Sequence, residues 1–150
     1  MTDKTPATES GSGFSAAERA AMQARAAELR AEGKKGGKRA DELQATLDAI
    51  AKMGPEDRAL AERVHMTVTE NGPGLSPRTW YGMPAYADAD GKVVVTFKHS
   101  GKFGTRYSTL EFQDAARLDD GPIWPVSFAF QTWNSAVEKK IADLVQTATA

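Results

Sequence analysis

The residues best suited to binding chemistry lie between Pro77 and Lys98, where the chain reads PRTWYGMPAYADADGKVVVTFK. Gly82 and Pro84 interrupt the strand pattern there, which is typical of a sheet edge, a bulge or the rim of a pocket. Aromatic side chains with a polar group suit a surface that is both apolar and able to form hydrogen bonds. The segment therefore predicts a ligand-binding site that includes Trp80, Tyr81, Met83 and Tyr86.

Two cations are expected near these aromatic residues. Alternation along a strand places Lys98 on the sheet face of Thr96, opposite Phe97, and Arg106 opposite Tyr107. Cations beside aromatic rings can bind an anionic or aromatic small molecule, with about 1–2 kcal/mol from each contact. A solvent-facing sheet often has the same residue types without any ligand, so both interpretations stay open. On the first interpretation Trp124, in a later strand, also belongs to the site.

The chain has no cysteine, which excludes thiolate-ligated metal sites, so pairs of carboxylates are the best candidates for a metal site. Asp119 and Asp120 are the preferred pair, and iron is the cofactor we would consider, since hard cations favour oxygen ligands. Both residues precede Gly121-Pro122, where aspartate is also common in an ordinary turn. A metal site therefore remains one of two interpretations.

Catalytic motifs are absent from the sequence. No serine lies in a Gly-x-Ser-x-Gly pattern and no glycine-rich phosphate loop occurs. The two histidines, His65 and His99, belong to no recognised motif. An enzyme that uses Tyr81, Arg106 or His99 as an acid or as an electrostatic stabiliser remains an alternative, provided that the site is dry and preorganised.

Composition narrows the possible partners. The chain has 150 residues and a net charge of −1, which argues against a dedicated nucleic-acid binder. No apolar stretch is long enough for a membrane span or resembles a secretory leader, so we expect a cytoplasmic protein. A small molecule or a metal ion is the expected partner. A protein partner and the oligomeric state stay open.

The order of predicted elements indicates an α+β fold. We expect two layers: an antiparallel sheet of about four to six strands, with helices packed on one face. The predicted helices cover 15–32, 41–52, 55–70 and 135–145, and the predicted strands cover 78–86, 92–98, 103–108 and 123–130. In the last of these strands, period-two alternation of Trp124, Val126, Phe128 and Phe130 predicts a core strand.

The N-terminal region is predicted to be an extension of this domain. Residues 1–13 are small and polar, which predicts a disordered tail, and Ser15 with Glu18 forms a capping box that begins a helix. Residues 14–40 comprise that helix and a Gly/Lys linker at 33–40, and the compact domain covers 41–150. Because its apolar stripe is thin, the helix should be peripheral, and a chain that begins at Asp41 should keep nearly the same denaturation midpoint.

Three segments resemble a known family. WYGMPAY, the DGKVVVTFK hairpin and DDGPIWPVSFA are similar to the YdhG-like small bacterial proteins, most of which have no assigned function. The resemblance covers about residues 41–144. It implies a compact helix–sheet–helix domain akin to frataxin, and one branch of the family is described as an intracellular iron chaperone. The family supplies no catalytic residues, so the site residues mapped by the resemblance are Trp80, Tyr81, Gly82, Met83, Pro84 and Trp124.

Overall fold

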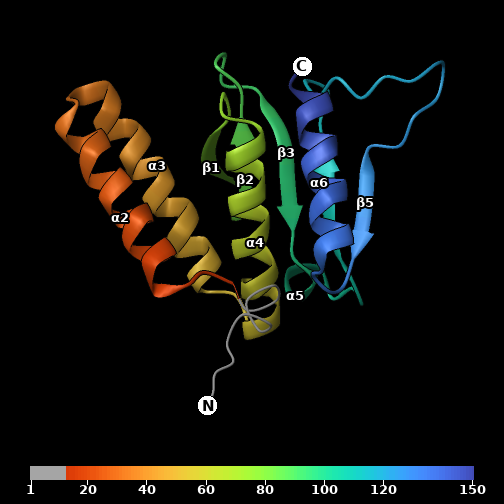
Figure 1. Ribbon diagram of the computed structural model, residues 1–150, viewed down its shortest axis with the longest axis horizontal. Helices are drawn as coiled ribbons and strands as arrows, with labels where there is room; N and C mark the ends of the chain where they lie inside the picture. The colour runs from red at the N-terminus through yellow and green to blue at the C-terminus, as the bar shows by residue number, and fades with distance from the viewer. Residues whose placement is uncertain (1–12) are drawn as a thin grey trace.

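A computed structural model describes residues 13–150 of the chain (Figure 1). The predicted tail at 1–13 lies outside the described residues except for Gly13. Three helices come first, a sheet follows, and one further helix closes the chain, which confirms the predicted α+β class. The helices are α2 (Ala16–Ala31), α3 (Lys34–Ala51), α4 (Pro55–Asn71), the short α5 (Ser100–Phe103) and α6 (Ser135–Ala148).

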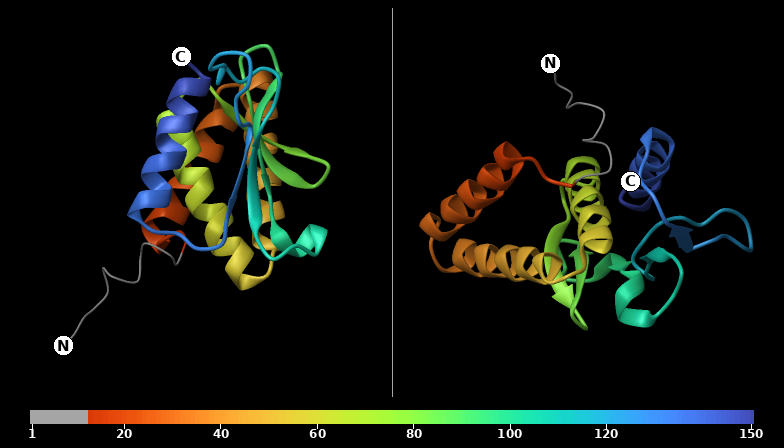
Figure 2. Two further views of the ribbon diagram at one scale, coloured as in Figure 1. Left: turned by 90° about the vertical axis from the view of Figure 1, so that its right-hand side faces the viewer. Right: turned by 90° about the horizontal axis from the view of Figure 1, so that it is seen from below.

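The sheet is an antiparallel meander of five strands in the order β1-β2-β3-β4-β5. Helices α4 and α6 lie along one face of the sheet, and α3 packs beside β1 and β2 (Figures 1 and 2). The short helix α5 and the β1–β2 hairpin extend from the other side of the sheet (Figure 2, left). The strands are β1 (Ser76–Trp80), β2 (Met83–Ala87), β3 (Val93–Lys98), β4 (Ser108–Phe112) and β5 (Ser127–Phe130).

The main core lies between the sheet and these helices. Alternation along the strands places Tyr86, Val95, Phe97 and Leu110 on the helix-covered face, and all four are fully buried. His65 of α4 is also fully buried, and its Nδ1 lies 2.9 Å from the Tyr86 hydroxyl. This hydrogen bond joins α4 to β2 at the centre of the core.

The prediction of a linker at residues 33–40 is wrong, because Lys34–Ala40 form the first turns of α3. Gly33 alone breaks the helix, with a φ of 105°. Gly36 lies so close to α2 that a Cβ there would overlap the Leu29 carbonyl oxygen. Tertiary packing of α2 on α3 therefore outweighs the low helix propensity of the glycines.

Three strand predictions also differ from the structure. Residues 78–86 form two strands, β1 and β2, because the chain reverses at Tyr81-Gly82. Residues 103–108 follow the turn of α5 and enter β4 only at Ser108. In the 123–130 segment only Ser127–Phe130 is a strand, and it pairs with β4 alone, so it is an edge strand and not a core strand.

Helix α2 contacts the rest of the molecule through a second, smaller apolar cluster. Ala26 and Leu29 of α2 are buried against Ala40 and Leu43 of α3, separately from the main core. Before the helix, the Phe14 N–H donates a hydrogen bond to the buried carboxylate of Glu62 on α4 at 2.9 Å. The capping box of Ser15 and Glu18 is present as predicted.

Removal of residues 1–33 tests whether α2 is peripheral. Asp41 lies inside α3, so the shortened chain should begin at Lys34 and not at Asp41. Because the truncation removes Ala26 and Leu29 and exposes Ala40 and Leu43 while the main cluster remains, we expect cooperative unfolding with a free energy lowered by about 2–4 kcal/mol. Urea denaturation followed by circular dichroism measures this difference. An unfolded or aggregated product would show that α2 is integral to the fold.

Replacement of His65 by Gln should weaken the pH dependence of stability. Burial lowers the pKa of His65 from 6.5 to about 4, so between these pH values the unfolded chain binds more protons than the folded chain. This contribution to stability is complete above pH 6.5 and is lost as the pH falls toward 4, by about 2 kcal/mol between pH 7 and pH 5. Urea denaturation at both pH values checks it. His99→Gln is the comparison variant, and it should change the pH dependence less because His99 is only half-buried. Equal pH dependence in wild type and His65→Gln would contradict the prediction.

Candidate functional site

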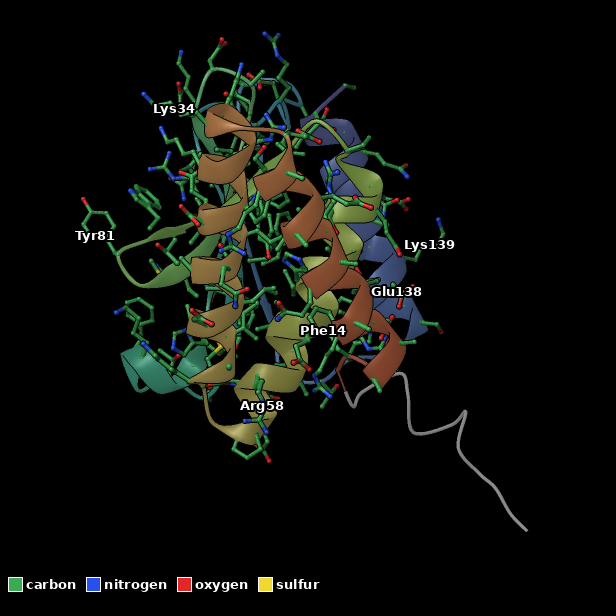
Figure 3. The ribbon with its side chains drawn as sticks, turned by 90° about the vertical axis from the view of Figure 1, so that its left-hand side faces the viewer. Phe14, Lys34, Arg58, Tyr81, Glu138 and Lys139 are labelled. Carbon is green, nitrogen blue, oxygen red and sulfur yellow. The ribbon has the colours of Figure 1, made fainter. Side chains whose placement is uncertain are left out.

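The β1–β2 hairpin ends in an exposed aromatic residue with an unusual backbone. Tyr81 and Gly82, the two turn residues, have φ values of 52° and 77°, as in a type I′ hairpin turn. Glycine adopts this conformation readily, whereas tyrosine rarely does. The Tyr81 side chain is 77 % exposed and extends away from the body of the molecule (Figure 3). Its ring contacts that of Trp80, with 5.2 Å between the centroids.

A cavity of about 710 Å³ lies beside this hairpin. Its walls come from the C-terminal half of α3, the α3–α4 connection, β1, the hairpin turn and α5. Figure 2 (left) shows the hairpin and α5 extending from the same side of the molecule. Small residues form much of the wall and leave room for a ligand. The lining residues are Ala45, Asp48, Ala49, Lys52, Met53, Gly54, Thr79, Gly82, His99, Gly101 and Lys102.

Three nitrogen-bearing side chains converge on this cavity from two elements, α3 and α5. Lys52 ends α3, while His99 and Lys102 lie at the start of α5 and within it. Within residues 13–150, neither lysine ammonium forms an ion pair. The buried Nδ1 of His99 likewise has no hydrogen-bond partner there. Burial lowers the pKa of His99; the nearby Asp57 carboxylate opposes this shift, and Lys102 adds to it. His99 is therefore a neutral imidazole at pH 7.

The carboxylates near the cavity already have partners. Asp57 of α4 accepts hydrogen bonds from the Ser100 hydroxyl at 2.8 Å and from the Gly101 N–H at 2.9 Å. Asp48 accepts one from the Gln44 amide at 3.0 Å. Asp48 lines the cavity too, but the two ammonium groups outnumber its single carboxylate there, and the His99 imidazole has an unused nitrogen, so the arrangement suits an anionic ligand.

The predicted aromatic site residues divide between the two faces of the sheet. Trp80 and Met83 are cross-strand neighbours next to the turn, so the structure brings these two and Tyr81 together. Tyr86 does not lie on a solvent-facing side of the sheet, although the sequence predicted it as part of the binding site. Residues alternate along β2, so Tyr86 points to the helix side, where it is fully buried against His65.

The predicted cations and Trp124 lie elsewhere. Lys98 is on the face opposite α4 and α6, where its ammonium lies 3.7 Å from the Glu111 carboxylate and over the Phe103 ring. Arg106 precedes β4 and lies over Tyr107, 5.3 Å from the ring centroid. Trp124 lines a different cavity of about 410 Å³, together with Asp119 and Asp120.

No metal centre is evident in the described part of the chain. Asp119 and Asp120 share their cavity with Asp143 and with Lys140, a cation that disfavours metal binding. Within residues 13–150, no group of three or more His, Asp or Glu side chains could hold a metal ion.

Sequence reasoning missed Lys52 and Lys102. The only available signal was that Lys102 follows His99 closely in the turn after β3. Lys52 is 50 residues away in the chain, so nothing local connects it with this site.

Comparisons with known proteins found no matching family model, no matching curated protein and no matching solved structure. The resemblance to the YdhG-like family therefore stays a prediction from the segments quoted above. No helix within residues 13–150 has the length and apolarity needed to cross a membrane.

Replacement of Tyr81 by Asn should stabilise the protein. Asparagine accepts positive φ more readily than tyrosine, so the type I′ turn should gain about 0.5–1 kcal/mol. Differential scanning calorimetry should show a higher melting temperature for Tyr81→Asn. The matched control, Tyr81→Phe, keeps an aromatic side chain with the same backbone preference and should melt as the wild type does. A lower melting temperature for Tyr81→Asn would contradict the interpretation of the turn.

Proposed function

We propose that this protein is a non-catalytic binding module for a small anionic molecule, held in the cavity beside the β1–β2 hairpin. The observation that supports it is the convergence of Lys52, Lys102 and His99 on a cavity of about 710 Å³. Ammonium groups without a carboxylate partner attract an anion, and the hydrogen bonds they form to it are strong. A neutral imidazole adds a further donor or acceptor.

The hairpin aromatics extend this proposal toward ligands with an aromatic part. Tyr81 lies in the turn between Thr79 and Gly82, which line the cavity, whereas alternation along β1 turns Trp80 to the opposite face of the sheet. The exposed Tyr81 ring provides a surface on which a planar group can stack. Positive φ at a tyrosine costs free energy, and such strain is often retained where the side chain has a binding role.

The alternatives from the sequence have less support. An enzyme that uses Tyr81 or Arg106 needs a dry site, whereas both side chains are exposed. The iron-chaperone role rests on the family resemblance and on Asp119 and Asp120, with no third metal ligand grouped with them in residues 13–150. Cytoplasmic location likewise stays a prediction from the sequence.

Thermal shift with a small panel of anions tests the proposal. Phosphate, citrate, benzoate and adenosine monophosphate vary the charge and the aromatic content of the probe. A ligand that binds only the folded state raises its melting temperature. We expect at least one anion to do so, with a smaller effect in 0.5 M NaCl because salt screens the charges.

Variants of the lysines locate the site. Lys52→Gln and Lys102→Gln should each weaken the binding of the active anion about 5–10-fold, as expected when one charged hydrogen bond is lost. Lys34→Gln is the matched control, since Lys34 begins the same helix that Lys52 ends, roughly 27 Å away at 1.5 Å per residue. Failure of every anion to stabilise the wild type, or equal weakening by Lys34→Gln, would refute the proposal.

A further inference from the structure

The buried pair of His65 and Tyr86 has hydrogen-bonding capacity that the core does not use. Both side chains are fully buried, and the His65 Nδ1 lies 2.9 Å from the Tyr86 hydroxyl. The other ring nitrogen, Nε2, is buried and has no hydrogen-bond partner within residues 13–150. Buried polar groups in folded proteins nearly always have a partner, so this nitrogen requires an explanation.

The tautomer of His65 follows from the same geometry. Burial keeps both groups neutral at pH 7, because it lowers the pKa of His65 to about 4 and raises that of Tyr86. If the Tyr86 hydroxyl donates to Nδ1, only the Nε2–H is left without a partner. If Nδ1–H donates instead, the phenol proton and Nε2 are both left unsatisfied within the described residues. The first arrangement is therefore favoured, and His65 presents an N–H donor at Nε2.

His65 lines a cavity of about 390 Å³, separate from the candidate site above. Helices α2, α3 and α4 and the start of β1 enclose it. This volume lies within the range of ligand pockets. About half of its wall is apolar, formed by Met22, Leu29, Leu43, Pro73, Leu75 and Pro77, and the rest is polar or charged.

The charges near this cavity give no excess of cations. Arg25 and Arg39 line it, but both pair with Glu32 of α2, at 4.0 Å and 2.7 Å. Arg25 also pairs with Glu28 at 3.4 Å, and the carboxylate of Glu42 lines the cavity too. With the cations compensated, an uncharged ligand fits this cavity better than an anion does.

We propose that this cavity binds an uncharged small molecule that has an apolar part and a hydrogen-bond acceptor, which receives the His65 Nε2–H. The apolar half of the wall accommodates the apolar part of the ligand, and the imidazole fixes its orientation. Helix α2 closes the cavity through Met22 and Leu29 and so becomes part of the site. This gives a function to the Ala-rich helix, which the hairpin cavity does not use.

A matched pair of probes tests the hydrogen bond directly. Acetophenone and α-methylstyrene have nearly the same shape, but only acetophenone has a carbonyl acceptor. The chain has two histidines, so the imidazole N–H signals are simple to assign by NMR. We expect acetophenone to shift the His65 Nε2–H resonance, to leave His99 unchanged, and to bind at least 5-fold more tightly than α-methylstyrene.

Variants extend the test beyond the wild type. His65→Leu should remove the preference for acetophenone, whereas His99→Gln should retain it. If His65→Leu does not fold, Leu29→Trp provides a second variant, because the larger side chain fills the cavity and should abolish binding of both probes. No shift of the His65 resonance up to the solubility limit of acetophenone, or equal affinity for the two probes, would overturn the proposal. The proposal would also be overturned if a bound water accepted the His65 Nε2–H and the signal stayed unchanged when acetophenone was added.

Discussion

The hydrogen bond between His65 and Tyr86 joins the helical layer to the sheet at the centre of the molecule. It links residues of α4 and β2 that are both fully buried, so it fixes both the orientation of α4 relative to β2 and the distance between them. A buried polar pair is favourable only when its partners are well placed, because an unsatisfied group in a low-dielectric core is costly. The apolar residues of the main cluster, which include Val64 and Phe97, supply most of the buried apolar surface.

The molecule has two apolar clusters, and its cavities lie where elements meet. The main cluster joins α4 and α6 to the sheet, while the smaller one joins α2 to α3. The hairpin cavity lies where α3, α5 and the β1–β2 turn come together. The His65 cavity lies where α2 and α3 meet α4 and β1.

The two proposed sites differ in chemistry because their surroundings differ. Around the hairpin cavity, Asp57 and Asp48 are already hydrogen-bonded, which leaves Lys52 and Lys102 without a carboxylate partner in the described residues. Around the His65 cavity, by contrast, Glu32 pairs with both arginines. The same residue types therefore favour an anion at one site and an uncharged ligand at the other. What distinguishes the sites is the pairing of the charges.

The sequence alone determined the fold class, the capping box at Ser15 and the turn chemistry, because these depend on local patterns of apolar residues, caps and glycines. It also indicated the WYGMPAY segment, but it did not show that Tyr81 and Gly82 reverse the chain. Only the tertiary structure decided that residues 34–40 are helical, since packing against α2 offsets the glycines. The tertiary structure also buried Tyr86 and brought Lys52 to His99 and Lys102. Such contacts join residues far apart in the chain, and no local pattern specifies them.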